Sequence, residues 1–276
     1  MLELHCHTTC SDGTLTPEEL VQAAISAGVK AMAITDHDTL AGWDAAINAA
    51  GDQLEIIPGL ELSTVHRERS LHILGYYPDP AKLVKPLQAR IEGRQRRAQK
   101  IADKLAALGF PIEVPNLPGN MAPGRPHIAK ALVKAGYVSH SQEAFTRWLG
   151  DGGPAYVQYE KFAAVDGIRL LLDCGAVPVW AHPYLFRGGT VESVLPELLE
   201  AGLMGIEVYH PNHSPSDERK LEDLCDRYDL LITGGSDYHG PSEEKHKAGV
   251  SLNGLKVPLS LLPPLKAAAI ALKDAS

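Results

Sequence analysis

Residues 2–7 read LELHCH, an apolar run that ends in the two histidines His5 and His7. Residues two apart on a strand project to the same side, so both imidazoles would lie on one face. Similar apolar runs carry a histidine or a carboxylate further along the chain, and the set is His37, Glu61, His72, His182, Asp237 and His239, with Asp12 following the first run. In a barrel the strand middles are buried and such residues converge at the carboxyl rim. The pattern predicts an α/β barrel with a metal site at its rim.

Strand and helix signals alternate around these residues. Thr16-Pro17-Glu18-Glu19 is typical of a helix start with a capping box, and this helix should end near Gly28. Strand-like runs occupy residues 29–35, 54–62, 70–77, 175–183, 205–211 and 230–240, and helical segments occupy 163–175, 192–202 and 214–229. The repetition predicts parallel strands with right-handed crossovers, about seven in all.

The alternation is interrupted between Asp79 and Tyr156. Residues 86–109 have the period of an amphipathic helix, with the apolar stripe Ile91, Ala98, Ile101, Leu105 and Leu108. A second helix should open at Pro126. We therefore expect a metal-binding barrel formed by residues 1–78 and 157–276. Residues 79–156 should form a helical insertion over the carboxyl rim that acts as a substrate-binding cap.

The chain of 276 residues is long enough for one barrel with a full core. Its charge is unevenly distributed along the sequence. The formal net charge of −8 argues against stable DNA binding and against a surface that binds nucleic acid all over, but it allows a local basic cleft. Residues 82–104 hold eight basic side chains against two acidic ones. Such a stretch is usually a solvated helix face; the functional alternative is a field that attracts nucleotides or RNA.

The amino-terminal residues have neither a basic region nor a long apolar stretch, and no apolar run reaches the ~20 residues of a membrane helix. The four cysteines, Cys6, Cys10, Cys174 and Cys225, form no C-x-x-C pair, which is typical of a reducing compartment. We expect a cytoplasmic protein with no membrane association. The sequence carries no signal for an oligomeric state.

Imidazole and carboxylate ligands without thiolates favour manganese, iron or zinc over copper(I). The nine candidate ligands exceed what one ion needs, so two or three ions are expected, with a carboxylate such as Glu61 bridging a pair. A single H-x-H motif is weak support, because it is common. The ordered set H-x-H, T-D-H, G-x-E, H-x-x-G-Y, A-H-P and S-D-x-H is specific.

On these motifs the chain resembles the polymerase and histidinol phosphatase (PHP) superfamily over essentially its full length. The resemblance implies a distorted (β/α)7 barrel with a trinuclear metal centre, with Mn²⁺ as the expected ion and Fe²⁺ or Zn²⁺ as alternatives. It also implies three ligand sets: His5, His7, Glu61 and Asp237 for the first metal, Glu61, His72 and His182 for the second, and Asp12, His37 and His239 for the third.

Residues 123–138, PGRPHIAKALVKAGYV, resemble the subfamily related to the TrpH and YciV proteins. This resemblance implies hydrolysis of nucleotide phosphates. Known members act on 3′,5′-bisphosphate nucleotides, on 5′-mononucleotides or on the 5′ ends of short RNA. The expected reaction is attack on a phosphomonoester, above all the 3′-phosphate of a nucleoside 3′,5′-bisphosphate, by a metal-bound hydroxide, because a bound metal lowers the pKa of its water to about 7. No side-chain nucleophile or leaving-group proton donor is assigned.

Arg125 is the leading residue for substrate binding. Its planar guanidinium can bind a phosphate through two donors, and it lies at a helix start, where free N–H groups favour anions. The alternative is an ordinary salt bridge. His127, Lys130 and Lys134 have the spacing of one helix face, which predicts a place for a second phosphate.

Several other polar residues allow more than one interpretation. Asp36 and Asp38 could orient imidazoles or be ordinary turn residues. Three histidines in polar stretches are expected at the surface: His66, His140 and His246. Three residues after a strand could face the rim or structure the loop: His210, Asn212 and His213. The pair Gly234-Gly235 should let the backbone turn tightly at a strand end.

Three functions compete with the nucleotide phosphatase. A 5′→3′ exoribonuclease would use the same metals on a phosphodiester. A histidinol phosphatase would share the ligand set, but it is not expected to carry the segment at 123–138. A non-catalytic, metal-stabilised accessory module would lose folding stability without metal and would never release phosphate.

Overall fold

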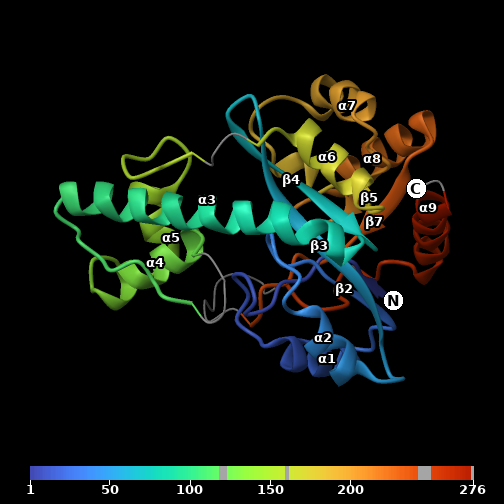
Figure 1. The fold of residues 1–276 in the computed structure, drawn as a ribbon, viewed down its shortest axis with the longest axis horizontal. Helices are drawn as coiled ribbons and strands as arrows, with labels where there is room; N and C mark the ends of the chain where they lie inside the picture. The colour runs from blue at the N-terminus through green and yellow to red at the C-terminus, as the bar shows by residue number, and fades with distance from the viewer. Residues whose placement is uncertain (118–122, 159–161, 242–249, 275–276) are drawn as a thin grey trace. The chain divides into compact units, whose positions relative to one another are not determined.

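The computed structural model describes residues 1–117, 123–158, 162–241 and 250–274. In these residues seven strands form one sheet in chain order (Figure 1), namely β1 (Leu2–Glu3), β2 (Ala31–Ile34), β3 (Glu55–His66), β4 (Arg69–Tyr76), β5 (Val177–Trp180), β6 (Gly205–Tyr209) and β7 (Leu231–Gly234). The sheet curves back on itself: Leu4 N–H donates to the Gly234 carbonyl (3.1 Å), and Cys6 and Tyr238 form an isolated parallel bridge. The expected distorted seven-stranded barrel is confirmed.

Helices connect the strands. They are α1 (Pro17–Ser26), α2 (Trp43–Ala50), α3 (Pro80–Ala107), α4 (Arg125–Lys134), α5 (Ser141–Ala144), α6 (Ala164–Asp173), α7 (Val191–Glu200), α8 (Pro215–Tyr228) and α9 (Leu262–Asp274), with shorter helical turns η1 (Phe145–Leu149), η2 (Pro183–Leu185) and η3 (Leu259–Leu261). The capping box of α1 is present as predicted. Glu19 N–H donates to Thr16 Oγ1 (3.2 Å), and Thr16 N–H donates to Glu19 Oε2 (2.9 Å).

The prediction of parallel strands is wrong for β4, which runs antiparallel to both β3 and β5, while the other neighbours are parallel. Only Arg67 and Glu68 separate β3 from β4, and both have positive φ (45° and 67°), so the chain makes a tight hairpin. A parallel connection would need about a dozen residues or more. The reversal brings His72, in the first half of β4, opposite Ser63, just past Glu61 on β3.

Two apolar clusters explain how the strands pack. Alternate residues of β2 face opposite sides. Ala31 and Ala33 join a cluster with residues of β1, β3, β4 and β5 and with Leu265 of α9. Met32 and Ile34 pack instead against α1 and α2. Apolar packing therefore covers both faces of the strand middles in this part of the sheet.

Gly235 is needed where the barrel closes. A Cβ atom at this position would lie 2.4 Å from the backbone nitrogen of His5. At Gly234 a Cβ would lie 2.6 Å from the Cβ of Tyr209. The two glycines therefore allow β7 to approach its neighbours closely, which corrects the prediction that they serve a tight turn.

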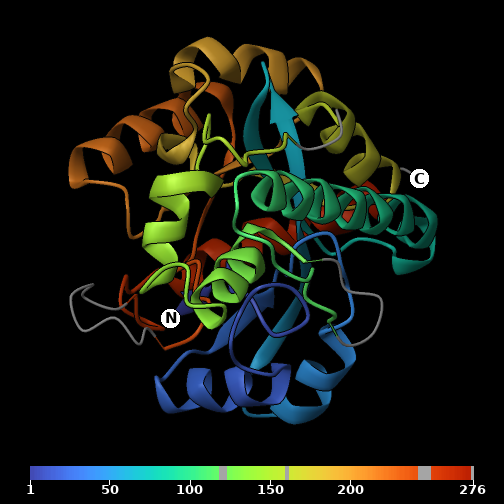
Figure 2. The same cartoon turned by 90° about the vertical axis from the view of Figure 1, so that its left-hand side faces the viewer.

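The chain divides into two compact units, one formed by Met1–Val84 with Lys161–Ser276 and the other by Lys85–Glu160. In the second unit Ile101 and Leu105 of α3 pack with Ile128 and Leu132 of α4 and with Trp148. In Figure 2, α3 is drawn in teal and the shorter helices of this unit in green.

Helix α3 departs from its prediction in three ways. It begins at Pro80 rather than at residue 86, because the Asp79 carboxylate accepts the Ala81 N–H (2.9 Å) at its start. Leu108 lies beyond its last residue and is 43% exposed. Two arginines of the basic stretch are buried rather than solvated: Arg94 and Arg97.

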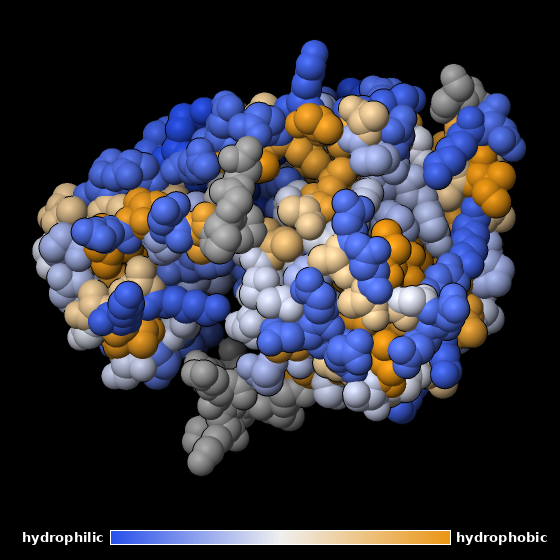
Figure 3. All heavy atoms as spheres, turned by 60° about the horizontal axis from the view of Figure 1, so that its bottom comes forward, coloured by the Kyte–Doolittle hydropathy of each residue, from blue (hydrophilic) through white to orange (hydrophobic). Residues whose placement is uncertain are grey.

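Hydrophilic side chains dominate the face drawn in Figure 3, with apolar ones scattered among them. Among the described residues the longest helix is α3, which spans 28 residues and has a sequence rich in charge. Of the helices in the described ranges, none combines the length and apolarity that a membrane crossing requires.

Candidate metal centre

All nine predicted ligands converge on one end of the barrel. His5 and His7 follow β1, Asp12 lies in the next turn, and His37 follows β2. Glu61 and His72 lie on the β3–β4 hairpin, His182 follows β5, and Asp237 and His239 follow β7. The isolated bridge between His37 and Glu61 continues the pairing of β2 with β3 beyond the end of β2. Because neighbouring strands end at one edge, their terminal side chains meet.

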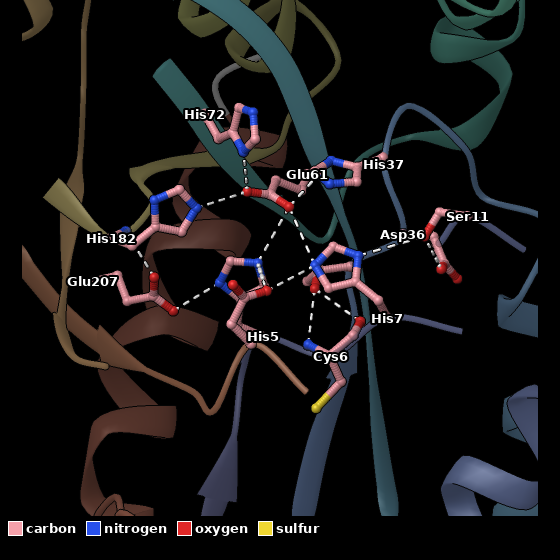
Figure 4. A network of polar contacts seen from close by, with 12 residues as sticks. His5, Cys6, His7, Ser11, Asp36, His37, Glu61, His72, His182 and Glu207 are labelled. Carbon is pink, nitrogen blue, oxygen red and sulfur yellow. Dashed lines mark hydrogen bonds and ion pairs between the residues drawn. The ribbon is translucent and has the colours of Figure 1, made fainter. Parts of the chain in front are cut away.

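Glu61 is the centre of this group (Figure 4). Its Oε2 lies 3.3 Å from His5 Nε2, 3.2 Å from His7 Nε2 and 3.2 Å from His37 Nδ1. Its Oε1 lies 2.7 Å from His72 Nδ1 and 3.1 Å from His182 Nε2. Five imidazoles therefore face a single buried carboxylate.

Two further carboxylates complete the cluster. Asp237 Oδ1 lies 3.3 Å from His5 Nε2 and 3.1 Å from His7 Nε2. Asp12 Oδ1 lies 3.2 Å from His239 Nε2, and Asp12 Oδ2 lies 3.7 Å from His37 Nε2.

The donor atoms form three groups, each with its atoms within 4.8 Å of one another. The groups are His5, His7, Glu61 and Asp237; His7, Asp12, His37 and His239; and His37, Glu61 and His72. The first matches an expected set, and the second contains another expected set together with His7. In the third, His37 takes the place expected for His182, although His182 also contacts Glu61.

The donors fit divalent cations. His5 Nε2 and His7 Nε2 are buried and form no hydrogen bond of ordinary geometry, although carboxylate oxygens face them. Nitrogen and oxygen donors directed at shared points are what a metal ion requires, and this mixture suits zinc, iron or manganese. None of the three groups contains a cysteine, and Cys6 packs in the apolar cluster with α1 and α2.

The pKa shifts in the cluster follow from the contacts between its imidazoles and its carboxylates. Burial would lower the pKa of His7, but Asp237 and Glu61 raise it to about 10. Burial would also lower the pKa of His5, yet Glu207, Asp237 and Glu61 raise it well above its usual range. Burial opposes ionisation of Glu61, but His37, His72 and His5 hold the pKa of this carboxyl well below its usual range. Without metal, protons on His5 and His7 therefore offset the negative charge of the carboxylates.

A polar network supports the loop that carries Asp12. Asp36 accepts hydrogen bonds from Thr8 N–H (2.8 Å), Thr8 Oγ1 (2.7 Å) and Ser11 Oγ (2.6 Å). Asp38 accepts from Ser63 N–H (3.0 Å). Both aspartates therefore hold backbone groups around the cluster.

Glu207 was not predicted from the sequence. It lies in the middle of β6, fully buried, with Oε1 at 2.9 Å from His5 Nδ1 and Oε2 accepting the backbone N–H of His182 (2.8 Å). The available signal was a carboxylate inside an otherwise apolar strand, GIEVY. Such a residue is stable only with partners.

Of the three residues after β6 that could face the rim or structure the loop, the structure assigns a role to His210 and His213. His213 Nδ1 lies 2.8 Å from the Val208 carbonyl, so it structures the loop. His210 is also buried and has a place in the site, because its Nε2 lies 3.6 Å from Asp237 Oδ2. The Asn212 N–H donates to His210 Nδ1 (3.2 Å).

Among the three histidines expected at the surface, the prediction for His66 is wrong. It is buried at the end of β3, with Nδ1 3.7 Å from Glu197 Oε2 and its ring edge-on to Phe186. His140 is exposed and caps α5 by accepting the Glu143 N–H (3.2 Å). His246 lies outside the described residues.

In the second unit, Arg125 is engaged by its own neighbours. Its Nη1 donates to Asp151 Oδ1 (2.9 Å) and to the Leu149 carbonyl (3.2 Å), and its guanidinium lies 5.4 Å from the centre of the Tyr156 ring. The helix α4 begins at this residue, as the proline at position 126 suggested.

The three other residues of the predicted helix face lie together. His127, Lys130 and Lys134 all line one groove of about 730 Å³, whose opposite wall is formed by residues 111–116. Arg125 is not among the residues that line this groove. The four predicted substrate-binding residues therefore form two separate features of the second unit.

Sequence comparisons place the chain among known proteins. The model of the PHP domain matches residues 3–85. A 5′-3′ exoribonuclease of Haemophilus influenzae is 36% identical over 247 residues, covering 87% of this chain and 90% of that protein. A 3′,5′-nucleoside bisphosphate phosphatase of Chromobacterium violaceum is 32% identical over 257 residues, 90% of each chain. A phosphoribosyl 1,2-cyclic phosphate 1,2-diphosphodiesterase of Eggerthella lenta is 34% identical, covering 86% of this chain and 94% of that protein.

A solved structure agrees with these matches. A protein from Bifidobacterium adolescentis, described as a metal-dependent phosphoesterase, superposes with a TM-score of 0.86 at 31% identity and covers 97% of this chain and 96% of its own. Its likeness extends over both the barrel and the second unit. Together with the cluster of histidines and carboxylates, these similarities show that the chain belongs to the PHP family of metal-dependent phosphoesterases.

Proposed function

We propose that this enzyme hydrolyses nucleotide phosphomonoesters, above all the 3′-phosphate of nucleoside 3′,5′-bisphosphates, and accepts 5′-mononucleotides as well. The observation that carries the proposal is the convergence of five imidazoles on Glu61. The substrate class is supported by the Chromobacterium violaceum relative, a 3′,5′-nucleoside bisphosphate phosphatase that aligns over 90% of this chain.

We assign the nine converging residues as ligands of two or three divalent ions, with Mn²⁺ first and Fe²⁺ or Zn²⁺ as alternatives. His5, His7, Glu61 and Asp237 would hold one ion, Glu61, His72 and His182 a second, and Asp12, His37 and His239 a third. When bound, such ions supply positive charge at the phosphoryl oxygens and lower the pKa of a water molecule, which is the chemistry that ester hydrolysis needs.

The chain's own residues set the geometry for this reaction. Glu61 and Asp237 hold the imidazoles of His5 and His7 toward a shared point, and Asp36 holds the turn that carries Asp12. A cysteine nucleophile is disfavoured, because burial raises the pKa of the Cys6 thiol well above its usual range. The side chains therefore position and neutralise rather than attack.

Arg125 is our proposed contact for the second phosphate, and the second unit is our proposed substrate-binding part. Arg125→Ala should raise KM for a nucleoside 3′,5′-bisphosphate about 10- to 100-fold and change KM for a 5′-mononucleotide much less, since a charge-assisted hydrogen bond contributes ~1.5–3 kcal/mol. The matched control is Arg147→Ala, because Arg147 also pairs with an acid (Glu143, 2.9 Å) and lies over an aromatic ring. Steady-state kinetics on both variants measure this effect. If Arg125→Ala leaves KM and turnover unchanged for every phosphate substrate, Arg125 is not the contact for the second phosphate.

A 5′→3′ exoribonuclease is the second candidate. The Haemophilus influenzae exoribonuclease is 36% identical, and the groove with Lys130 and Lys134 offers positive charge to a polyanion. This activity would use the same ligands on a phosphodiester, so the two functions can coexist.

The proposal is tested by phosphate release from a panel of substrates with Mn²⁺-loaded protein and an EDTA control. The panel contains adenosine 3′,5′-bisphosphate, AMP, 3′-AMP, a short 5′-phosphorylated RNA and histidinol phosphate. We expect the bisphosphate to give the highest kcat/KM. Accumulation of mononucleotides from the RNA as the dominant reaction would establish the exoribonuclease instead. If Mn²⁺-loaded protein releases phosphate from no member of the panel, the substrate assignment is wrong.

A further inference from the structure

Glu207 contacts two of the proposed ligands that come from different strands (Figure 4). His5 follows β1 and His182 follows β5, so they are 177 residues apart along the chain (182 − 5). Glu207 lies on β6 and has no exposed surface. A carboxylate that has no contact with solvent is stable only when protein groups neutralise its charge and donate hydrogen bonds to its oxygens. The two partners of Glu207 therefore stabilise it in this position.

The contact with His5 fixes the ring of that residue. Glu207 Oε1 lies 2.9 Å from His5 Nδ1, and an ionised carboxylate can only accept, so the proton is on Nδ1. His5 Nε2 faces the point shared with Glu61 Oε2 and Asp237 Oδ1, each 3.3 Å away, and would present its lone pair there to a bound ion. A carboxylate behind a histidine in this way sets both the tautomer and the orientation of a ligand.

The contact with His182 fixes the backbone of that residue. His182 has left-handed dihedrals (φ 33°, ψ 62°), which cost free energy for any residue with a Cβ atom. Glu207 Oε2 accepts the His182 N–H (2.8 Å) and so holds this turn. The side chain of His182 is thereby kept with its Nε2 at 3.1 Å from Glu61 Oε1.

We propose that Glu207 is a positioning residue that couples two metal positions, one that uses His5 and one that uses His182. The inference rests on the proposed ligand assignment. Because each oxygen serves one partner, loss of the carboxylate should weaken both positions together. Glu207 contacts His5 and His182, so the group of Asp12, His37 and His239 should keep its affinity.

The test is Glu207→Gln, which preserves size but opposes an amide N–H to one of the two donors. Metal-free protein is titrated with Mn²⁺, and bound metal is counted after dialysis at fixed free Mn²⁺. We expect a 10- to 100-fold loss of affinity for the ions held through His5 and His182, with the remaining class of site near wild type. Excess Mn²⁺ should restore most of kcat, because the chemistry itself is unchanged.

Glu222→Gln is the matched control. Glu222 also accepts a hydrogen bond from the β6 region, from Tyr209 Oη (2.7 Å), but contacts none of the nine ligands. It should bind Mn²⁺ like the wild type. If Glu207→Gln does not fold, Glu207→Asp is titrated in its place, and partial loss of affinity is expected.

Wild-type affinity and stoichiometry in a folded Glu207 variant would overturn the inference. Equal weakening of every class of site would also overturn it, because that result indicates a general structural role. Failure of the substrate proposal looks different: wild-type protein would bind Mn²⁺ but release no phosphate from the nucleotides.

Discussion

Glu61→Gln should lower kcat/KM for the preferred phosphate ester about a thousandfold, a loss of about 4 kcal/mol in transition-state stabilisation. Glu61 is buried and faces His5, His7 and His37 through one oxygen and His72 and His182 through the other. The amide is the same size but carries no charge, so two of the three groups of donors lose their shared carboxylate. The loss should persist at high substrate concentration, because the missing charge serves the reaction rather than substrate binding alone.

The measurement pairs steady-state kinetics with a count of bound Mn²⁺. Glu197→Gln is the matched control, since Glu197 also faces a buried histidine of the barrel, His66, at 3.7 Å but lies outside the cluster. It should keep wild-type kinetics. A folded Glu61→Gln variant with more than a tenth of wild-type kcat/KM would contradict the bridging role.

The nine residues that form the cluster could be selected from the sequence because most of them stand at or near the end of an apolar run, which is a local property. Glu61 and His72 lie inside β3 and β4, so for these two residues the apolar run indicated the strand but not where it ends. The direction of β4 needed one more step. The two residues between β3 and β4 are too few for a crossover, and this requires the hairpin that puts His72 at the rim.

Other features depend on contacts that no local pattern contains. Glu207 and its partner His5 are 202 residues apart, and only the closed barrel brings them together. His66 was expected at the surface because its sequence neighbours are polar, yet Phe186 and Glu197, from the other half of the barrel, cover it. The partners of Arg125 are also distant in sequence: Asp151 lies 26 residues away.

Removal of divalent metal should abolish phosphate release and lower the melting temperature by roughly 5–10 °C. Metal at a hundred times its dissociation constant stabilises the folded state by about 2.7 kcal/mol, and roughly 2–4 °C accompanies each kcal/mol in a protein of this size class. Protein dialysed against EDTA is compared with protein dialysed against EDTA that has been saturated with Mn²⁺, which has no capacity left to remove the bound metal. Added Mn²⁺ should restore both properties. Loss of stability without any metal-dependent turnover in the wild type would indicate an accessory module.

Metal binding should also release protons, and its affinity should rise with pH. Burial alone would lower the pKa of His7, but Asp237 and Glu61 raise it to about 10, so the metal-free imidazole is protonated at pH 7. An imidazole must lose that proton before it can bind a metal ion, so protons and metal ions compete for the same nitrogen. Paired with its carboxylates, protonated His7 stabilises the metal-free fold fully below the unfolded pKa of about 6.5, and that stabilisation is lost as pH rises toward 10. Bound metal should therefore stabilise the fold more at pH 8 than at pH 6. Calorimetric titrations of Mn²⁺ in two buffers of different ionisation enthalpy measure the released protons, and equal heats in both would show that the cluster does not hold them.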